Sequence, residues 1–162
     1  MIIVVAGLPG SGKSYFAIRL AARLGAEYLN SDRVRKRFAA MGKYSFDDKL
    51  RIYEYMAQMA AAAVRAGKPA VVDATFYHHS MRDLFNGTAR DCHCEIRFIL
   101  VTASEALTRE RLSWPRPDSE ADFGVYQSMK HLFEKFEGPH LLLHSKNDNV
   151  EEMIEVALKY LG

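Results

Sequence analysis

The stretch "MIIVVAGLPGSGKS", residues 1–14, decides the fold of this chain. Its apolar start predicts a buried strand, and residues 7–14 complete the pattern G-x-x-x-x-G-K-[ST]. Between a strand and a helix, such a loop lets backbone N–H groups approach phosphate oxygens, and the positive end of the following helix points at them. The sequence therefore predicts a phosphate-binding loop, the P-loop. It consists of Gly7, Leu8, Pro9, Gly10, Ser11, Gly12, Lys13 and Ser14.

The two polar side chains that end the P-loop have separate expected roles. Lys13 is expected to reach the β- and γ-phosphates of a bound nucleotide. The hydroxyl of Ser14 is expected to ligate Mg²⁺. ATP and Mg²⁺ are therefore the expected cofactors, and the alternative is a glycine-rich turn with an exposed lysine.

Length and composition indicate one globular domain over residues 1–162. The 162 residues compare with ~150 residues per domain. Apolar residues make up 49% and charged residues 26%, which is typical of a protein that buries a core. The formal net charge is only +2, so overall charge does not indicate a nucleic-acid partner.

Cysteine usage and hydropathy predict a cytoplasmic protein without membrane contact. Cys92 and Cys94 are the only cysteines, which fits a reducing compartment better than a disulfide-stapled secreted domain. No apolar run approaches the ~20 residues that span a bilayer. The first residues also lack the features of a signal peptide, so the chain is expected to begin in its fold. Nothing in the sequence indicates the oligomeric state.

Short apolar runs alternate with longer helical patterns, as in proteins whose crossover helices cover both faces of a parallel sheet. The predicted fold class is therefore α/β, a three-layer α/β/α P-loop NTPase fold with a five-stranded parallel sheet and a small helical lid. The predicted strands are Ile2 to Ala6, Glu27 to Asn30, Ala70 to Ala74, Glu95 to Val101 and Leu141 to His144. The predicted helices start after the P-loop and cover Asp32 to Ala40, Phe46 to Ala66, Ser80 to Arg90, Ser104 to Leu112, Asp122 to Phe136 and Val150 to Leu161. The proline-containing stretch "SWPRPDSEAD", about residues 113–122, is the expected lid.

A P-loop alone does not select a reaction, because switches, motors and kinases share it. A GTP switch needs N-K-x-D and D-x-x-G; "SKND" at 145–148 resembles the first, but the second is absent. That segment is better explained as a strand-to-helix turn with Asp148 or Asn147 as its cap. A motor carries Asp followed by Glu after an apolar strand, whereas "AVVDATF" has Ala74 there. A small kinase remains.

Polar residues after the second and third strands are candidates for binding the acceptor of the phosphoryl group, because ligands bind beyond the carboxyl ends of such strands. Asp32 is a candidate general base, although Asp32 or Ser31 can instead cap the next helix. Asp73 can orient Mg²⁺ through water, hold an acceptor group, or pair with a basic side chain. Thr75 is a further candidate acceptor contact.

Arginines are expected on both sides of the acceptor. In "RVRKR", residues 33–37, most side chains fit a solvated helix face, but Arg35 lies three residues after Asp32 and can grip an acceptor phosphate. Arg109, Arg111 and Arg116 flank the expected lid, where an arginine can stabilise the transferring phosphoryl group. Surface ion pairing is the alternative for each of these three.

Structural explanations are preferred for three other features. The "CHC" segment at 92–94 lacks a second ligand pair for zinc. His78 and His79 fit a loop beside a helix cap. The Tyr and Met residues of "RIYEYMAQM", 51–59, recur at helical spacing and fit a core.

Taken together, the chain resembles the small P-loop kinases, AAA-type ATP-binding kinases that include the kinase domain of phage polynucleotide 5'-hydroxyl kinase and zeta-toxin-like proteins. "GLPGSGKS", "NSD" followed by Arg35, "DAT", and "SEALTRER" leading into "FGVYQSM" occur in that family's order over nearly the whole chain. The resemblance implies Asp32 as general base, Arg35 as an acceptor-phosphate contact, Asp73 in the acceptor site and Arg109 as the first lid arginine. The family's second lid arginine falls near Ser113, so Arg111 or Arg116 is expected to substitute for it.

The sequence thus predicts an ATP-dependent phosphotransferase with an alcohol group as acceptor. The leading expectation for the acceptor is a nucleic-acid 5'-OH end. A small metabolite, nucleotide-sugar or antibiotic is the alternative, and a nucleotide-binding regulator without an acceptor is the third hypothesis.

Overall fold

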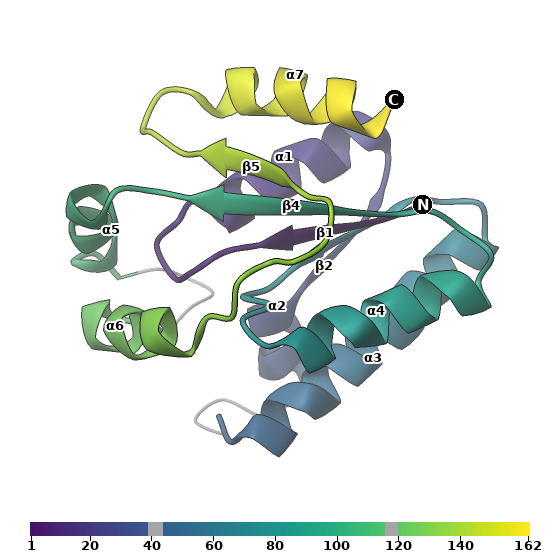
Figure 1. Cartoon of the computed structure of the whole chain (residues 1–162), viewed down its shortest axis with the longest axis horizontal. Helices are drawn as coiled ribbons and strands as arrows, with labels where there is room; N and C mark the ends of the chain where they lie inside the picture. The colour runs from purple at the N-terminus through teal and green to yellow at the C-terminus, as the bar shows by residue number, and fades with distance from the viewer. Residues whose placement is uncertain (39–43, 116–119) are drawn as a thin grey trace.

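The five predicted strands pair into one parallel sheet with the order β2-β3-β1-β4-β5 (Figure 1). The structure is a computed structural model that describes residues 1–38, 44–115 and 120–162. The strands are β1 (Ile2–Ala6), β2 (Glu27–Asn30), β3 (Ala70–Asp73), β4 (Ile96–Thr102) and β5 (Leu141–His144). The predicted strands were correct to within a residue at each end.

Seven helices connect or follow these strands in the described residues. They are α1 (Lys13–Leu24), α2 (Ser31–Arg37), α3 (Phe46–Arg65), α4 (His79–Asp91), α5 (Glu105–Leu112), α6 (Phe123–Leu132) and α7 (Val150–Leu161). The start of α3 is fixed by a capping box in which the Ser45 hydroxyl accepts the Asp48 N–H at 3.1 Å. The second helix was predicted to run to Ala40, but it ends at Arg37, with Phe38 as its C-cap.

One helix is shorter than predicted. The expected helix from Asp122 to Phe136 ends at Leu132, and the chain continues in an extended conformation from Phe133. There the Glu134 N–H donates to the Tyr77 carbonyl at 2.8 Å, and the rings of Phe133 and Phe136 pack on the core. Contacts with the loop after β3 and with the core therefore end the helix. No Gly or Pro immediately precedes Phe133, so the sequence contains no local signal for this helix end.

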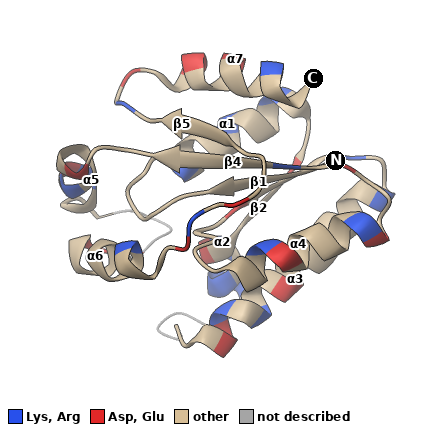
Figure 2. Ribbon diagram, in the orientation of Figure 1, with Lys and Arg blue, Asp and Glu red and all other residues tan. Residues whose placement is uncertain are grey.

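Helices cover both faces of the sheet, which confirms the predicted three-layer α/β/α architecture. Ile2 and Val4 of β1 face a core formed with α3 and α4, whereas Ile3 and Val5 face a core formed with α1 and α7. Figure 2 shows charged residues mainly on the helices and connecting segments, with few on the strands. Among the described residues, no helix is both long and apolar enough to cross a membrane.

The strand order brings the predicted site segments to one edge of the sheet. Strand β3 lies between β2 and β1, with Asp73 in register with Asn30 on one side and with Val5 on the other. The P-loop follows β1 directly, and α2 follows β2. Residues 7–14, 30–35 and 73–77 therefore meet beyond the carboxyl ends of adjacent strands, as expected for a doubly wound sheet.

Candidate active site

The P-loop has a backbone that only glycine fits at its critical positions. Gly12 is left-handed, with φ of 87°, and a Cβ there would lie 2.6 Å from the Ser145 Oγ. A Cβ on Gly7 would collide with the Val101 carbonyl oxygen. Gly12 also precedes α1 without any side-chain cap from the described residues, so the first N–H groups of α1 point into the loop unpaired.

This loop fits a triphosphate. Besides the uncapped N–H groups, the Oγ of Ser11 is buried and has no hydrogen-bond partner among the described residues. Lys13 Nζ makes only a long hydrogen bond, 3.4 Å, to the Leu8 carbonyl in that part of the chain. Donors converge where an anion would bind, which is the usual arrangement at such a helix start.

Three of the four sequence-predicted residues on the acceptor side, all except Asp73, line a single cavity of about 490 Å³. Its walls come from the P-loop, α1, β2, α2, α3, the loop after β3, and α6. The predicted site residues in this wall are Pro9, Lys13, Ser14, Asp32, Arg35 and Thr75. The fold therefore brings together the P-loop lysine and the candidate base, which are 19 residues apart in sequence.

Asp32 does not cap α2. The cap is Asn30, whose Oδ1 accepts the Arg33 N–H at 3.0 Å. Asp32 instead lies in the first turn of α2 and is one of the residues that line the cavity. Arg35, one turn further along, is 4% exposed and lines the same cavity, with its guanidinium carbon 4.7 Å from the centre of the Tyr44 ring.

Asp73 lies behind the cavity wall and is fully buried. Its Oδ2 accepts hydrogen bonds from the Tyr28 hydroxyl at 2.7 Å and the Asn30 amide at 2.6 Å, and both donors line the cavity. Burial and the adjacent Asp73 carboxylate raise the pKa of Tyr28, so it remains a hydroxyl. The alternative of a basic partner for Asp73 is not seen among the described residues.

The other carboxylate oxygen of Asp73, Oδ1, is buried without a partner in the described residues. Asp73 pairs in register with Val5 of β1, and β1 leads directly into the P-loop, so Asp73 and the P-loop lie at the same carboxyl edge of the sheet. A carboxylate and a hydroxyl are the hard oxygen donors that Mg²⁺ takes, directly or through water. The donor set therefore fits the expected ion.

A second cavity of about 410 Å³ adjoins the P-loop and shares Lys13, Ser14 and Tyr15 with the first. Arg111 forms part of its wall and is held in place. Its guanidinium donates to the Gly10 carbonyl at 3.2 Å, the Ser145 hydroxyl at 3.1 Å and the Lys146 carbonyl at 3.0 Å. Burial lowers the pKa of Arg111. The hydrogen bonds of Arg111 therefore link the P-loop to the turn after β5.

The turn after β5 was predicted correctly, but its cap was not. Residue Asn149, rather than Asp148 or Asn147, stands at the start of α7. The Asn149 Oδ1 accepts the Lys146 N–H at 2.7 Å, and its amide donates to the His144 carbonyl at 2.9 Å. The Asn149 side chain thus stabilises the turn through both of these hydrogen bonds. Asn147 is instead one of the residues that line the second cavity.

Of the remaining lid arginines, the one that the structure describes, Arg109, lines neither cavity. Arg109 is exposed on α5, with its guanidinium carbon 3.8 Å from the centre of the Phe123 ring on α6. Arg116 lies outside the described residues, as does the middle of the expected lid. At the end of that segment, Glu120 accepts a hydrogen bond of 2.5 Å from the Tyr44 hydroxyl, and Ala121 lines the acceptor cavity.

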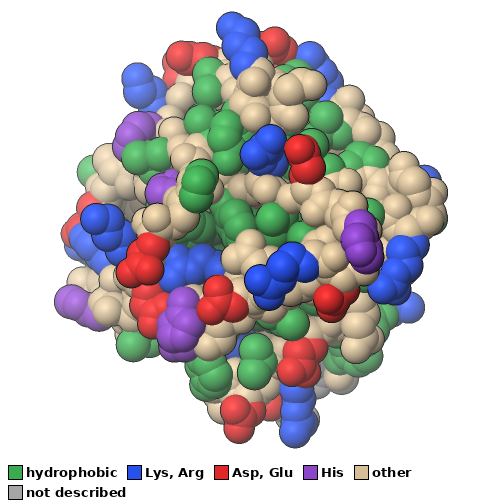
Figure 3. Space-filling view, turned by 45° about the vertical axis from the view of Figure 1, so that its right-hand side comes forward, with side chains coloured by type: hydrophobic (Ala, Val, Ile, Leu, Met, Phe, Trp, Pro, Cys, Tyr) green, Lys and Arg blue, Asp and Glu red, His purple; other side chains and the backbone are tan. Residues whose placement is uncertain are grey.

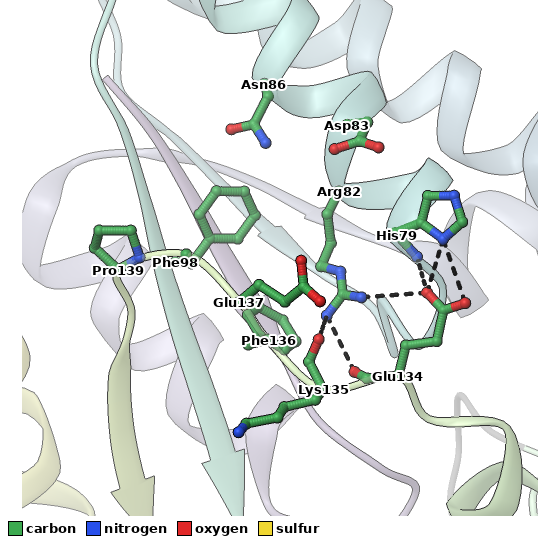
Figure 4. A pocket seen from close by; sticks show the side chains of 11 residues that line it. His79, Arg82, Asp83, Asn86, Phe98, Glu134, Lys135, Phe136, Glu137 and Pro139 are labelled. Atoms are coloured by element: carbon green, nitrogen blue, oxygen red, sulfur yellow. Dashed lines mark hydrogen bonds and ion pairs between the residues drawn. The ribbon is translucent and has the colours of Figure 1, made fainter.

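A third cavity of about 420 Å³ lies outside the P-loop region, between α4, β4 and the segment after α6 (Figure 4). There Arg82 donates to the Glu134 and Lys135 carbonyls, and its guanidinium also faces the Glu134 carboxylate at 3.4 Å. The imidazoles of His78 and His79 lie 3.4 and 3.0 Å from the same carboxylate. This cluster ties the segment after α6 to the loop after β3.

The histidines were predicted to lie in a loop beside a helix cap, but His78 is the cap itself and His79 is the first residue of α4. The His78 Nδ1 accepts the Ser80 N–H at 3.2 Å. The proton of neutral His78 is therefore on Nε2, which faces Glu134 as a donor. Two histidines and a carboxylate can hold a metal in principle, but this tautomer and the nearby Arg82 favour a hydrogen-bonded cluster.

Among the residues of the acceptor cavity that sequence reasoning missed are Lys49 and Tyr53 of α3. They are four residues apart and share one helix face. The predicted core role of the "RIYEYMAQM" segment is confirmed for Tyr53 and Met56, which are buried. The sequence contained one signal for this part of the site, the charge of Lys49. This lysine lies on the helix face that otherwise carries the buried positions 52, 53, 56, 57 and 60.

The fold and this site define a P-loop nucleotide-binding protein. The sequence matches the AAA domain family over residues 2–136, and the chain belongs to that family. No curated protein matches it. The prediction of a P-loop fold is thereby confirmed.

Solved structures of P-loop kinases share the fold. A sugar kinase from Janibacter sp. HTCC2649 has a TM-score of 0.79 at 21% identity, covering 99% of this chain and 93% of its own. The Mycobacterium tuberculosis APS kinase CysC, in complex with AMPPNP and APS, has a TM-score of 0.77 at 18% identity, covering 99% and 96%. A gluconokinase from Sinorhizobium meliloti 1021 has a TM-score of 0.74 at 21% identity, covering 98% and 90%. The resemblance to small P-loop kinases therefore holds at the level of the fold.

Proposed function

We propose that this protein is an ATP- and Mg²⁺-dependent kinase that transfers the γ-phosphoryl group to a hydroxyl of a small molecule. The observation that carries the proposal is the cavity of about 490 Å³ whose wall joins the P-loop residues Lys13 and Ser14 to Asp32. Its volume is in the range of small-ligand sites, ~300–1,000 Å³. Kinase relatives by fold, among them a sugar kinase and a gluconokinase, support the same reaction class.

Each residue has a task that its position supports. The P-loop N–H groups and Lys13 would bind the β- and γ-phosphates, and Ser14, with Asp73 behind the wall, would hold Mg²⁺, which neutralises charge on the phosphates. Asp32 would accept the proton of the attacking hydroxyl and orient its oxygen toward the γ-phosphorus. Arg35 and Thr75 would position the acceptor. Arg109 stays a proposed lid residue, which would stabilise the transferring phosphoryl group.

The geometry favours a small acceptor over the nucleic-acid 5'-OH end expected first. A strand of nucleic acid needs a groove long enough for several backbone phosphates. In the basic run, Arg33 and Arg35 line the cavity but Lys36 does not, so the run does not extend the cavity into such a groove. The cavity instead has walls from five helices and strands, α1, β2, α2, α3 and α6, and from the loops next to them. On the face shown in Figure 3, basic, acidic and histidine side chains are interspersed rather than gathered into a basic stripe.

The test is phosphate transfer from γ-labelled ATP to a panel of polyols, sugars, sugar acids and 5'-OH oligonucleotides. We expect transfer to at least one small alcohol and none to the oligonucleotides. Asp32→Asn should keep ATP affinity and lose about 10²- to 10⁴-fold in kcat, the range for a positioned base. Tight ATP binding without transfer to any acceptor would instead support the regulator hypothesis.

A further inference from the structure

The acceptor cavity contains a cation without an anionic partner. Lys49 of α3 is half-buried in its wall. Within residues 1–38, 44–115 and 120–162, its Nζ contacts the Met129 sulfur at 3.8 Å and faces the Tyr77 ring at 4.9 Å, with no carboxylate or carbonyl oxygen in reach. Removing an ammonium group from water without such a partner is costly, so this arrangement needs a compensating role.

A second cation lies nearby in the same wall. The guanidinium of Arg35 is buried, and its positive charge adds to burial in lowering the pKa of Lys49. The cavity wall in the described residues carries Lys13, Arg33, Arg35 and Lys49 against the single carboxylate of Asp32. Lys13 belongs to the P-loop and its nucleotide, so Arg33, Arg35 and Lys49 are the cations in the acceptor part of this wall.

A buried hydroxyl completes the set. The Tyr53 oxygen accepts the Phe76 N–H at 2.9 Å, and no acceptor for its own proton occurs among the described residues. Tyr53 is 3% exposed and lines the cavity one helical turn after Lys49. Burial raises its pKa, so it keeps that proton and can donate it. Figure 1 shows the start of α3 and helix α6 on the same side of the sheet, and the contact of Lys49 with Met129 joins them.

We propose that the acceptor carries an oxyanion, a carboxylate or a phosphate group, and that Lys49, Arg35 and the Tyr53 hydroxyl bind it. This inference rests on the proposed function. Three donors from α2 and α3 then hold the anion, while Asp32 is left for the hydroxyl that attacks ATP. An uncharged acceptor of the same size leaves Lys49 desolvated and unpaired, so the site rejects it.

The test compares matched acceptors with and without the charge: glycerate against glycerol, and glucose 6-phosphate against glucose. We expect the wild type to prefer the charged member of at least one pair. Lys49→Met should reduce this preference, measured as the ratio of kcat/KM values, roughly 10- to 100-fold, the range for a hydrogen bond to a charged group. Lys49→Arg should retain most of it. The control is Lys159→Met, an exposed lysine on α7, which should leave the ratio unchanged.

Binding supplies a readout that does not depend on transfer. With the P-loop saturated by ADP, calorimetry should detect glycerate or glucose 6-phosphate binding to the wild type and a loss of at least 10-fold in Lys49→Met. The Tm of ligand-free Lys49→Met should equal or exceed that of the wild type, because an unpaired charge is removed; this shows that the variant folds. Equal preference for charged and uncharged acceptors, or unchanged anion binding in Lys49→Met, would overturn the oxyanion site and leave the proposed kinase intact. Failure of all transfer with anion binding retained would overturn the kinase alone.

Discussion

Replacing Gly12 by Ala tests whether the P-loop backbone is shaped for phosphate. Two costs are expected from the structure. An Ala in the left-handed conformation costs about 1–2 kcal/mol relative to Gly. The new Cβ would also lie 2.6 Å from the Ser145 Oγ and 3.0 Å from an Arg111 guanidinium nitrogen.

The clash at Gly12 cannot be relieved by a simple side-chain rotation. The Ser145 Oγ accepts a hydrogen bond of 3.1 Å from each of the two terminal guanidinium nitrogens of Arg111, so moving the Ser145 hydroxyl breaks these bonds. Overpacking of this kind costs about 1–3 kcal/mol. The expected loss in the free energy of unfolding is therefore about 2–5 kcal/mol, and the start of α1 should shift by a few tenths of an ångström.

Gly25→Ala is the matched control. Gly25 ends α1 with a φ of 60°, also left-handed, but an added Cβ there meets nothing within 4 Å. This variant should lose only the conformational cost, about 1–2 kcal/mol as at Gly12, or about 2–8 °C in Tm. Urea unfolding followed by circular dichroism measures both variants.

ATP affinity separates the two glycines. Gly12→Ala misplaces the N–H groups that would bind phosphate, so we expect ATP affinity to fall at least ~10-fold, the loss of about one charge-assisted hydrogen bond. Gly25→Ala should bind ATP as the wild type does. If calorimetry gives equal ATP affinities for both variants at a temperature where both are folded, the assignment of residues 7–14 as the phosphate cradle is wrong.

Three further predictions concern single contacts. Lys13→Ala should abolish phosphate transfer to every acceptor while the circular dichroism spectrum stays unchanged; measurable transfer would contradict the role of this lysine. Tyr28→Phe removes one of two hydrogen bonds to the buried Asp73 carboxylate and should lower the free energy of unfolding by about 1.5–3 kcal/mol in urea; an unchanged value would mean that water replaces the hydroxyl. The backbone N–H of His79, together with nearby imidazoles, holds the pKa of Glu134 below its usual value, so its stabilisation is present above the unfolded pKa of ~4.3 and is lost as pH falls through the folded pKa. Glu134→Gln should therefore lose less stability than the wild type between about pH 5 and pH 3, as measured by thermal unfolding, and parallel curves would refute this.

The strands and the P-loop could be predicted because their signals are local. Apolar runs of four to seven residues such as β1 and β4 fit only a buried sheet once the P-loop fixes their neighbour. The position of Asp32 was also predictable, since chain order places the residues after β2 and β3 at the same edge. The residue that caps α2 could not be predicted, because Asn30, Ser31 and Asp32 are all residue types that cap helices well. Only the structure shows that the Asn30 side chain accepts the hydrogen bond from the Arg33 N–H.

Other features depended on contacts distant in sequence. The end of α6 is set by the loop after β3 through Glu134 and Tyr77, 57 residues apart, which no local pattern contains. Lys49 joins the site because α3 crosses back beside α6, where Met129 contacts it. A motif search cannot find such a residue, but a charged side chain on an otherwise buried helix face is a reason to ask what it faces.

Three unpaired polar groups of the described chain lie near the two ends of the proposed reaction, whereas a fourth, the buried Arg97 Nε of β4, lies beside the Tyr160 ring of α7. Ser11 Oγ and Asp73 Oδ1 lie at the P-loop and the strand beside it, and Lys49 lies in the acceptor cavity. Proteins pair nearly all of their buried polar groups, so each of these lowers the stability of the ligand-free fold. The three groups near the reaction gain partners when nucleotide, Mg²⁺ and an anionic acceptor bind, because hydrogen bonds to charged groups are worth most where water is excluded. Ligands should therefore stabilise this protein in an ordered way: ADP and Mg²⁺ raise the Tm of the wild type, the anionic acceptor raises it further, and in Lys49→Met only the second increment is lost.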